Sequence, residues 1–112
     1  FTAGREFHYP EHAGAFFDKL HDTIRFMQDC DVILYQAGAD PHIGDPLGGF
    51  LTTEQLFQRD LLLFTECRQR GIPVAWNLAG GYQQHTDGST NWGALTEIHT
   101  NTLKACWNAL TG

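Results

Sequence analysis

Apolar side chains recur at helical spacing in the first third of the chain. Between about residues 12 and 29 they fall three or four residues apart on one helical face, with charged side chains on the other faces, which predicts an amphipathic helix. The apolar face consists of Phe17, Leu20, Ile24 and Met27. Residues 1–12 are polar and aromatic and show no periodicity, so we predict a loop there.

A second helix has signals at both of its ends. Thr52 followed by Gln55 is a capping box, and Gly71 ahead of Pro73 is typical of a helix stop. The apolar face between these signals consists of Leu56, Phe57, Leu61, Leu63, Phe64 and Cys67. A third helix is predicted from about residue 93 to residue 110.

Two short apolar runs, residues 31–36 and 73–78, predict strands. A nearly continuous apolar run such as the first suits a strand that is buried on both faces of a parallel sheet. Two strands joined through a helix read as a right-handed βαβ unit, so the pair should be parallel. The order α-β-α-β-α places the chain in the α/β class, with a parallel sheet flanked by helices.

A sheet of two strands looks incomplete, because a parallel pair needs helices on both faces and usually has further strands beside it. We expect either that the other strands come from another part of a longer polypeptide, or that copies of this chain associate and cover the exposed edges. The chain begins at Phe1 rather than Met, which favours a fragment.

Composition narrows the class of protein. A chain of 112 residues with 42% hydrophobic and 18% charged residues fits a single folded domain. A formal charge of −6, with seven scattered Lys and Arg residues, disfavours nucleic-acid binding. The chain has neither a membrane-spanning apolar run nor a signal peptide, which predicts a soluble cytoplasmic protein. The three cysteines, predicted to be buried thiols, are Cys30, Cys67 and Cys106.

The candidate chemistry lies in the loops that follow the two strands, because ligands of open α/β sheets bind at the carboxyl ends of the strands. The first loop, in QAGADPHIGDPLGG, holds Asp40, His42 and Asp45 among several glycines. The second, in LAGGYQ, presents Tyr82 directly after two glycines.

The run LYQAGADPHIGDPLGG, followed by a helix and then IPVAWNLAGGYQ, resembles the last catalytic segment of the histone deacetylase family. The resemblance covers about residues 30–112. The EIHTNT stretch at residues 97–102 is similar to a helix of bacterial members named for acetoin utilisation and for acetylpolyamine hydrolysis. The resemblance implies the three-layer arginase-deacetylase fold, with residues 1–112 forming the C-terminal portion of a single deacetylase-like domain.

The resemblance also implies a zinc ligand. The family holds one zinc ion between an Asp-x-His pair from an earlier segment and a single aspartate in a Gly-Ala-Asp turn. That turn matches Gly38-Ala39-Asp40, so Asp40 is the predicted ligand. A carboxylate suits a catalytic zinc that keeps a position open for water and the substrate carbonyl. The alternative is that Asp40 closes a turn through its own backbone.

Tyr82 matches the tyrosine whose hydroxyl, in the family, hydrogen-bonds the substrate carbonyl as it becomes an oxyanion. Gly80 and Gly81 before it would let the backbone approach the substrate closely. The alternative is a tyrosine that only packs its ring over the loop. Many members have another glycine or a glutamate where Ala79 stands here, which leaves subclass and substrate open.

Other polar residues receive weaker roles. We predict that Asp45 orders the GDPLGG turn. His42 follows Asp40 in an Asp-x-His string, but in the family that string belongs to an earlier strand, and an arginase-like two-manganese site would need an aspartate at position 42. The remaining histidines lack a convergent partner, and surface or packing roles are predicted for His8, His12, His21, His85 and His99.

Two hypotheses follow from the resemblance. In the first, the chain is the C-terminal segment of a zinc-dependent hydrolase that removes acetyl groups from acetylated lysine or acetylated polyamines. The other two zinc ligands and the proton-transfer histidines would then lie upstream, and the isolated chain would be inactive. In the second, the chain is a truncated, non-enzymatic relative that acts as an oligomerising or binding module.

Overall fold

The computed structural model describes residues 6–112. Along the chain it contains the 3-10 helix η2 (Pro10–His12), the helices α1 (Ala13–Phe26), α2 (Thr53–Gln69) and α3 (Trp92–Thr111), and the strands β1 (Ile33–Gly38) and β2 (Val74–Ala79). The predicted order of helix, strand, helix, strand and helix is confirmed. The loop predicted for residues 1–12 ends in η2, and its first five residues lie outside the described residues.

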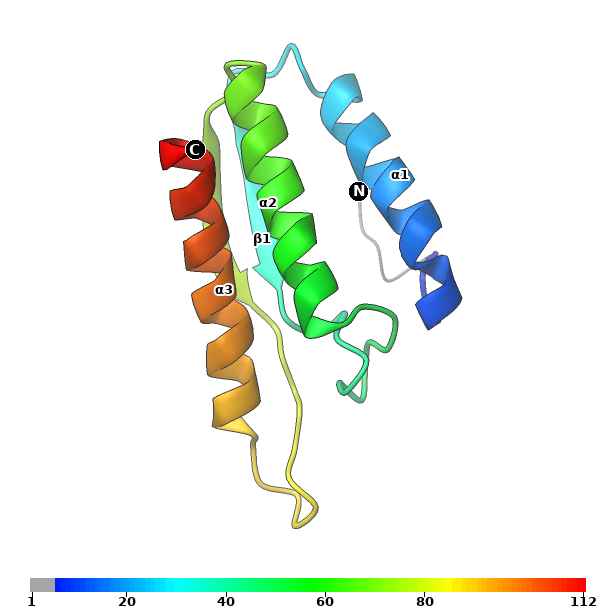
Figure 1. Ribbon diagram of the computed structural model, residues 1–112. Coiled ribbons are helices and arrows are strands. Elements are labelled where there is room, and N and C mark those ends of the chain that lie inside the picture. The colour runs from blue at the N-terminus through cyan, green and yellow to red at the C-terminus, as the bar shows by residue number, and fades with distance from the viewer. Residues whose placement is uncertain (1–5) are drawn as a thin grey trace.

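The strands β1 and β2 form a parallel pair, as predicted. Its register runs from Ile33 beside Val74 to Gly38 beside Ala79. Helix α2 carries the chain from the end of β1 back to the start of β2, and α3 follows β2. Both helices lie over the same face of the pair, and α1 lies on the other side of α2 (Figure 1). The chain therefore has the α/β architecture that its apolar pattern predicts.

Helix α2 begins and ends where its sequence signals lie. The Thr52 hydroxyl accepts the Gln55 N–H at 3.1 Å, and the Gln55 side chain accepts the Thr52 N–H at 2.9 Å, so both halves of the capping box form. At the other end Gly71 adopts a φ of +71°, and the Ile72 amide donates to the Cys67 carbonyl at 2.8 Å. Glycine stops this helix because it enters the left-handed region without the penalty of a Cβ.

Helix α1 packs on the loop that follows β1. Leu20 and Ile24 of the predicted apolar face are buried, but Phe16 is more deeply buried than its predicted neighbour Phe17. The Phe16 ring packs edge-on against Phe50 in that loop, with ring centroids 5.3 Å apart. Such aromatic pairs contribute about 0.5–1.5 kcal/mol beyond the area they bury. The contact ties the N-terminal helix to the candidate site.

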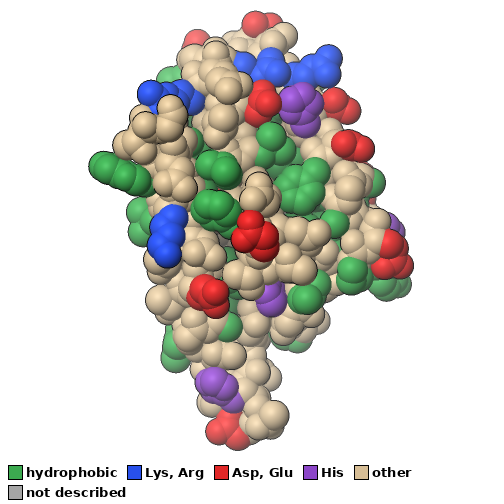
Figure 2. Space-filling model, viewed as in Figure 1, with side chains coloured by type: hydrophobic (Ala, Val, Ile, Leu, Met, Phe, Trp, Pro, Cys, Tyr) green, Lys and Arg blue, Asp and Glu red, His purple; other side chains and the backbone are tan. Residues whose placement is uncertain are grey.

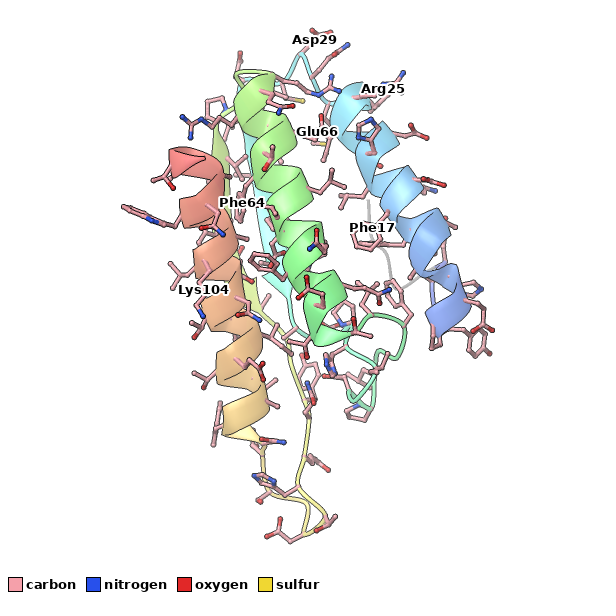
Figure 3. All side chains as sticks on the ribbon, in the orientation of Figure 1. Phe17, Arg25, Asp29, Phe64, Glu66 and Lys104 are labelled. Atoms are coloured by element: carbon pink, nitrogen blue, oxygen red, sulfur yellow. The ribbon has the colours of Figure 1, made fainter. Side chains whose placement is uncertain are left out.

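Aromatic packing also joins α2 to the sheet. Phe64 of α2, labelled in Figure 3, lies between Tyr35 of β1 and Trp76 of β2, with ring centroids 5.8 Å and 5.6 Å away. Further along the α2–α3 contact the buried residues include Leu63, Cys67, Ile98 and Ala105. The core of the described residues therefore lies between the helices and one face of the strand pair.

The other face of the strand pair is bare. Ile33 and Ala37 point into the core and are 5% and 1% exposed, whereas Leu34, between them on the opposite face, is 79% exposed. Its register partner Ala75, and the next outward pair Gln36 and Asn77, are exposed as well. The prediction that β1 is buried on both faces is therefore wrong for the described residues, because α2 and α3 cover the same face of the pair and α1 lies beyond α2 (Figure 1).

The cysteines differ in their surroundings. Cys67 is buried, and burial raises the pKa of its thiol, while Cys106 is half-buried. Cys30 lies in the turn between α1 and β1 and is exposed, so its predicted burial is wrong. Its position just past the end of α1 explains the error, because the apolar face of that helix no longer covers it.

Charge is unevenly spread over the helical face. In this view the Lys and Arg side chains lie mainly at the end of the molecule away from the loops that follow β1 and β2 (Figure 2).

None of the helices within residues 6–112 is both long and apolar enough to cross a membrane.

Candidate functional site

The two loops singled out in the sequence leave the same edge of the sheet. We call residues 39–52, which follow β1, the Asp40 loop, and residues 80–91, which follow β2, the Tyr82 loop. The last residues of the strands, Gly38 and Ala79, are register partners, and the Ala39 amide donates to the Ala79 carbonyl at 2.9 Å. The prediction that Asp40 and Tyr82 lie in adjacent loops at one end of a parallel sheet is confirmed.

Asp40 sits between two glycines. A Cβ built on Gly80 would overlap Asp40 Oδ1, and one built on Gly38 would lie 2.8 Å from the same oxygen. Any side chain at either position would collide with the carboxylate, so the two glycines form a cradle for it. No hydrogen bond joins this carboxylate to another residue in the described part of the chain. Among the described residues, no side chain or backbone group therefore competes for this carboxylate.

Tyr82 follows two residues in the left-handed region. Gly80 has a φ of +60° and Gly81 a φ of +100°, and a Cβ on Gly81 would lie 2.6 Å from Leu95 Cδ2. Both positions thus require glycine for local conformation and space. The Tyr82 side chain is 49% exposed, so its hydroxyl is not locked into the core.

The Asp45 carboxylate bonds to both loops. Its Oδ1 accepts the Leu47 N–H at 2.8 Å within the Asp40 loop, and its Oδ2 accepts the Tyr82 N–H at 2.7 Å. Asp45 is only 6% exposed. The turn that precedes it is also in contact with the Tyr82 loop, since a Cβ on Gly44 would lie 2.9 Å from Gln83 Oε1. The two loops are therefore docked against each other at several points.

His42 has both ring nitrogens in use. Nδ1 accepts the Gly44 N–H at 2.9 Å, and Nε2 lies 2.8 Å from the Thr53 hydroxyl. Burial lowers the pKa of His42, although nearby Asp45 acts in the opposite direction. A neutral ring with Nε2 protonated satisfies these contacts and leaves no lone pair for a metal. Within residues 6–112 no group of three or more His, Cys, Asp or Glu side chains is placed to hold a metal ion.

A buried polar network beneath the Asp40 loop was not foreseen in the sequence. Asp60 of α2 is 1% exposed, and its carboxylate accepts hydrogen bonds from the Tyr35 hydroxyl, from Arg59 Nε at 2.9 Å and from the Thr102 hydroxyl at 2.5 Å. These partners come from β1, α2 and α3, so one carboxylate joins three elements. Burial raises the pKa of Tyr35, and Asp60 adds to the effect.

Arg59 connects this network to the candidate zinc ligand. Its Nη1 donates to the Gly38 carbonyl at 2.8 Å, two residues before Asp40. Burial alone lowers the pKa of Arg59, but neighbouring Tyr35 and Asp60 outweigh it and the pKa is raised. The guanidinium therefore stays charged and holds the backbone at the end of β1. The sequence contained one signal of the Arg59–Asp60 pair. Residues 59 and 60 lie on the same helical stripe as Leu56 and Leu63, where charged side chains are unexpected.

The remaining histidines do not gather at the site. His12 Nδ1 accepts the backbone N–H groups of His8 and Tyr9 near the N-terminus. His99 lies on α3, and its Nδ1 is buried without a hydrogen-bond partner among the described residues. Burial, followed by the charge of Arg59, lowers the pKa of His99.

Comparison with known proteins assigns the family. The model of the histone deacetylase domain matches residues 9–99, which include both loops of the candidate site. The chain therefore belongs to the histone deacetylase domain family. The match begins upstream of residue 30, where the sequence resemblance was expected to start.

A curated relative is similar over a shorter stretch. Over 56 residues the chain is 39% identical to an uncharacterized protein of Picosynechococcus sp. (strain ATCC 27264 / PCC 7002 / PR-6). That stretch covers 49% of this chain and 19% of the relative. The chain thus spans about a fifth of the length of the relative it matches.

Proposed function

We propose that this chain supplies Asp40 and Tyr82 to the active site of a zinc-dependent hydrolase that removes acetyl groups from acetylated lysine or acetylated polyamines. Membership of the histone deacetylase domain family supports the reaction class. The observation that carries the proposal is the docking of the two loops at one edge of the sheet, with the Asp40 carboxylate cradled between Gly38 and Gly80.

Asp40 fits one ligand position of a zinc site, because its carboxylate is partly accessible and has no competing hydrogen bond within residues 6–112. A catalytic zinc takes about three protein ligands, so we infer that the others come from residues outside the described chain. When bound, zinc polarises a carbonyl and activates water at neutral pH. Arg59 would keep the Asp40 turn in place through the Gly38 carbonyl.

Tyr82 would act as the electrophilic donor. Tyr82 is half exposed, and its hydroxyl would donate a hydrogen bond to the acetyl carbonyl as negative charge develops on that oxygen. One such donor contributes about 3 kcal/mol to transition-state stabilisation. Gly80 and Gly81 would bring the backbone close to the substrate, with the space beside their Cα atoms already taken by Asp40 and Leu95.

The test uses the full-length protein and an acetylated lysine peptide, with acetylated polyamine as a second substrate. Tyr82→Phe should lower kcat about a hundredfold or more and leave bound zinc unchanged, whereas Asp40→Ala should lose zinc. Tyr9→Phe removes the hydroxyl of another exposed tyrosine and serves as the matched control. Full activity of the Tyr82→Phe enzyme would remove Tyr82 from the mechanism.

A second candidate function is a binding or self-associating module without catalysis. The observation that favours it is apolar surface: Leu34 on the bare face of the sheet is 79% exposed, and Trp92 and Trp107 of α3 are 71% and 67% exposed. Light scattering on the 112-residue chain should then show oligomers, with no zinc binding or hydrolysis. A compact monomer that hydrolyses acetyl-lysine with added zinc would contradict this candidate and the need for outside ligands.

The two candidate functions also make different predictions for the coding sequence upstream of this segment. The enzyme requires an upstream coding sequence with paired histidines and an Asp-x-His string, and the non-enzymatic module does not. Sequencing the reading frame around this segment distinguishes them before any assay.

A further inference from the structure

Asp45 belongs to the Asp40 loop and accepts hydrogen bonds from both loops of the site. Its Oδ1 accepts the Leu47 N–H at 2.8 Å, and its Oδ2 accepts the Tyr82 N–H at 2.7 Å. A carboxylate with two oxygens can accept from both donors at once, and a hydrogen bond that a backbone N–H donates to a carboxylate is stronger than one between neutral groups. At 6% exposure the bond to Tyr82 is also protected from competing water.

Tyr82 depends on such a support. The two residues before it are glycines with φ values of +60° and +100°, and glycine has the greatest backbone freedom of any residue. The ring is 49% exposed, so packing fixes only part of it. The bond from the Tyr82 amide to Asp45 fixes the backbone at the point from which the side chain leaves.

We propose that Asp45 is a positioning residue, which sets the place of the Tyr82 hydroxyl relative to Asp40 by holding the Tyr82 amide. The proposal rests on the proposed function of Tyr82 as the oxyanion donor. Such a donor acts over a narrow range, about 2.7–3.1 Å from the oxyanion. A displacement of about 1 Å is enough to lower the rate about a hundredfold.

Neighbouring contacts point the same way. Gly80 approaches the Asp40 carboxylate, and Gln83 approaches Gly44, so the residues on either side of Tyr82 also lie against the Asp40 loop. Asp45 provides the hydrogen bond at the middle of this docked segment. Its loss should therefore shift Tyr82 locally and leave the carboxylate of Asp40 in its glycine cradle.

The experiment compares Asp45→Asn, Tyr82→Phe and the double variant in the full-length enzyme. An amide has one acceptor oxygen, so Asp45→Asn leaves one of the two backbone donors unpaired. We expect kcat to fall about tenfold, with KM and zinc content unchanged. In the Tyr82→Phe background the same substitution should change kcat less than about twofold, because the hydroxyl it positions is already gone.

Two further variants complete the design. Asp45→Ala removes both acceptors and should lower kcat at least as far as Asp45→Asn. Asp87→Asn is the matched control, since Asp87 Oδ1 accepts the Ser89 N–H at 2.9 Å in the Tyr82 loop without bonding Tyr82, and it should keep full activity.

The outcomes separate the two claims. If Tyr82→Phe loses activity while both Asp45 variants keep it, the positioning role is overturned and the proposed function stands. Equal losses from Asp45→Asn in the parent enzyme and in the Tyr82→Phe background would mean general structural damage, and would also overturn the positioning role. An active Tyr82→Phe enzyme would overturn the proposed function itself.

Discussion

Replacing Asp60 with alanine should destabilise the protein more than replacing a carboxylate on its surface. Asp60 is 1% exposed and accepts hydrogen bonds from Tyr35, Arg59 and Thr102. Without it the Arg59 cation, itself 5% exposed, loses its compensating charge, and removing one partner of a buried ion pair costs about 3–5 kcal/mol. Each unsatisfied buried hydroxyl costs about 1–3 kcal/mol, but these costs overlap. We expect a total loss of about 4 kcal/mol in the free energy of unfolding.

Urea unfolding of the full-length protein, followed by tryptophan fluorescence, measures this loss. Asp60→Ala should be compared in the native and the Arg59→Met background. Its cost should be about 2–3 kcal/mol smaller in the second, because no cation is left uncompensated. Glu66→Ala is the control on the same helix. The Glu66 side chain is 19% exposed; it pairs with Arg70 at 3.2 Å and lies 3.5 Å from His21 Nδ1, and because none of these groups is fully buried its loss should cost only about 1 kcal/mol.

Two results would refute this reasoning. One is a cost below about 1 kcal/mol for Asp60→Ala, which would mean that water or rearranged side chains replace the carboxylate easily. The other is an equal cost in both backgrounds, which would show that the charge of Arg59 is not what Asp60 compensates.

Two further predictions concern a glycine and a histidine. Gly80→Ala should weaken zinc binding, measured by metal titration of the full-length protein, because the new Cβ would meet the Asp40 carboxylate; Gly88→Ala, at a φ of +87° with open space around it, should not. For His99 the folded pKa lies below the unfolded value, so the unfolded chain binds more protons as the pH falls through about 6.5. The melting temperature should therefore drop between about pH 7.5 and pH 5.5, and drop less in His99→Gln; an equal drop in both proteins would contradict the assignment.

Elements with local signals could be predicted from the sequence. The capping box at Thr52 and the stop at Gly71 act within one helical turn, so residue types alone locate α2. The strands and their parallel pairing also follow, because short apolar runs joined through a helix have few alternatives. The placement of Asp40 and Tyr82 at one edge is a consequence of that topology, and it needed no knowledge of side-chain contacts.

Contacts between distant residues were not predictable in the same way. Tyr82 and Asp45 are 37 residues apart, and their hydrogen bond depends on how two glycine-rich loops dock. The Asp60 network joins residues from three elements, and a charged pair within an apolar stripe has no assigned partner until those elements are packed. The exposed Leu34 is a third case. An apolar pattern indicates which faces of a strand should be buried, but it does not identify the segment that buries them.

The hydrogen bond that the Tyr82 amide donates to Asp45 involves the main chain of Tyr82 and not its side chain. Every residue except proline carries the same N–H, so Asp45 could hold the backbone at position 82 whatever side chain stands there. A variant with another residue at position 82 would keep the present course of the loop and would differ only in the side chain that faces the substrate. Evolution can thus alter or silence this donor by a single codon change while the architecture around it persists.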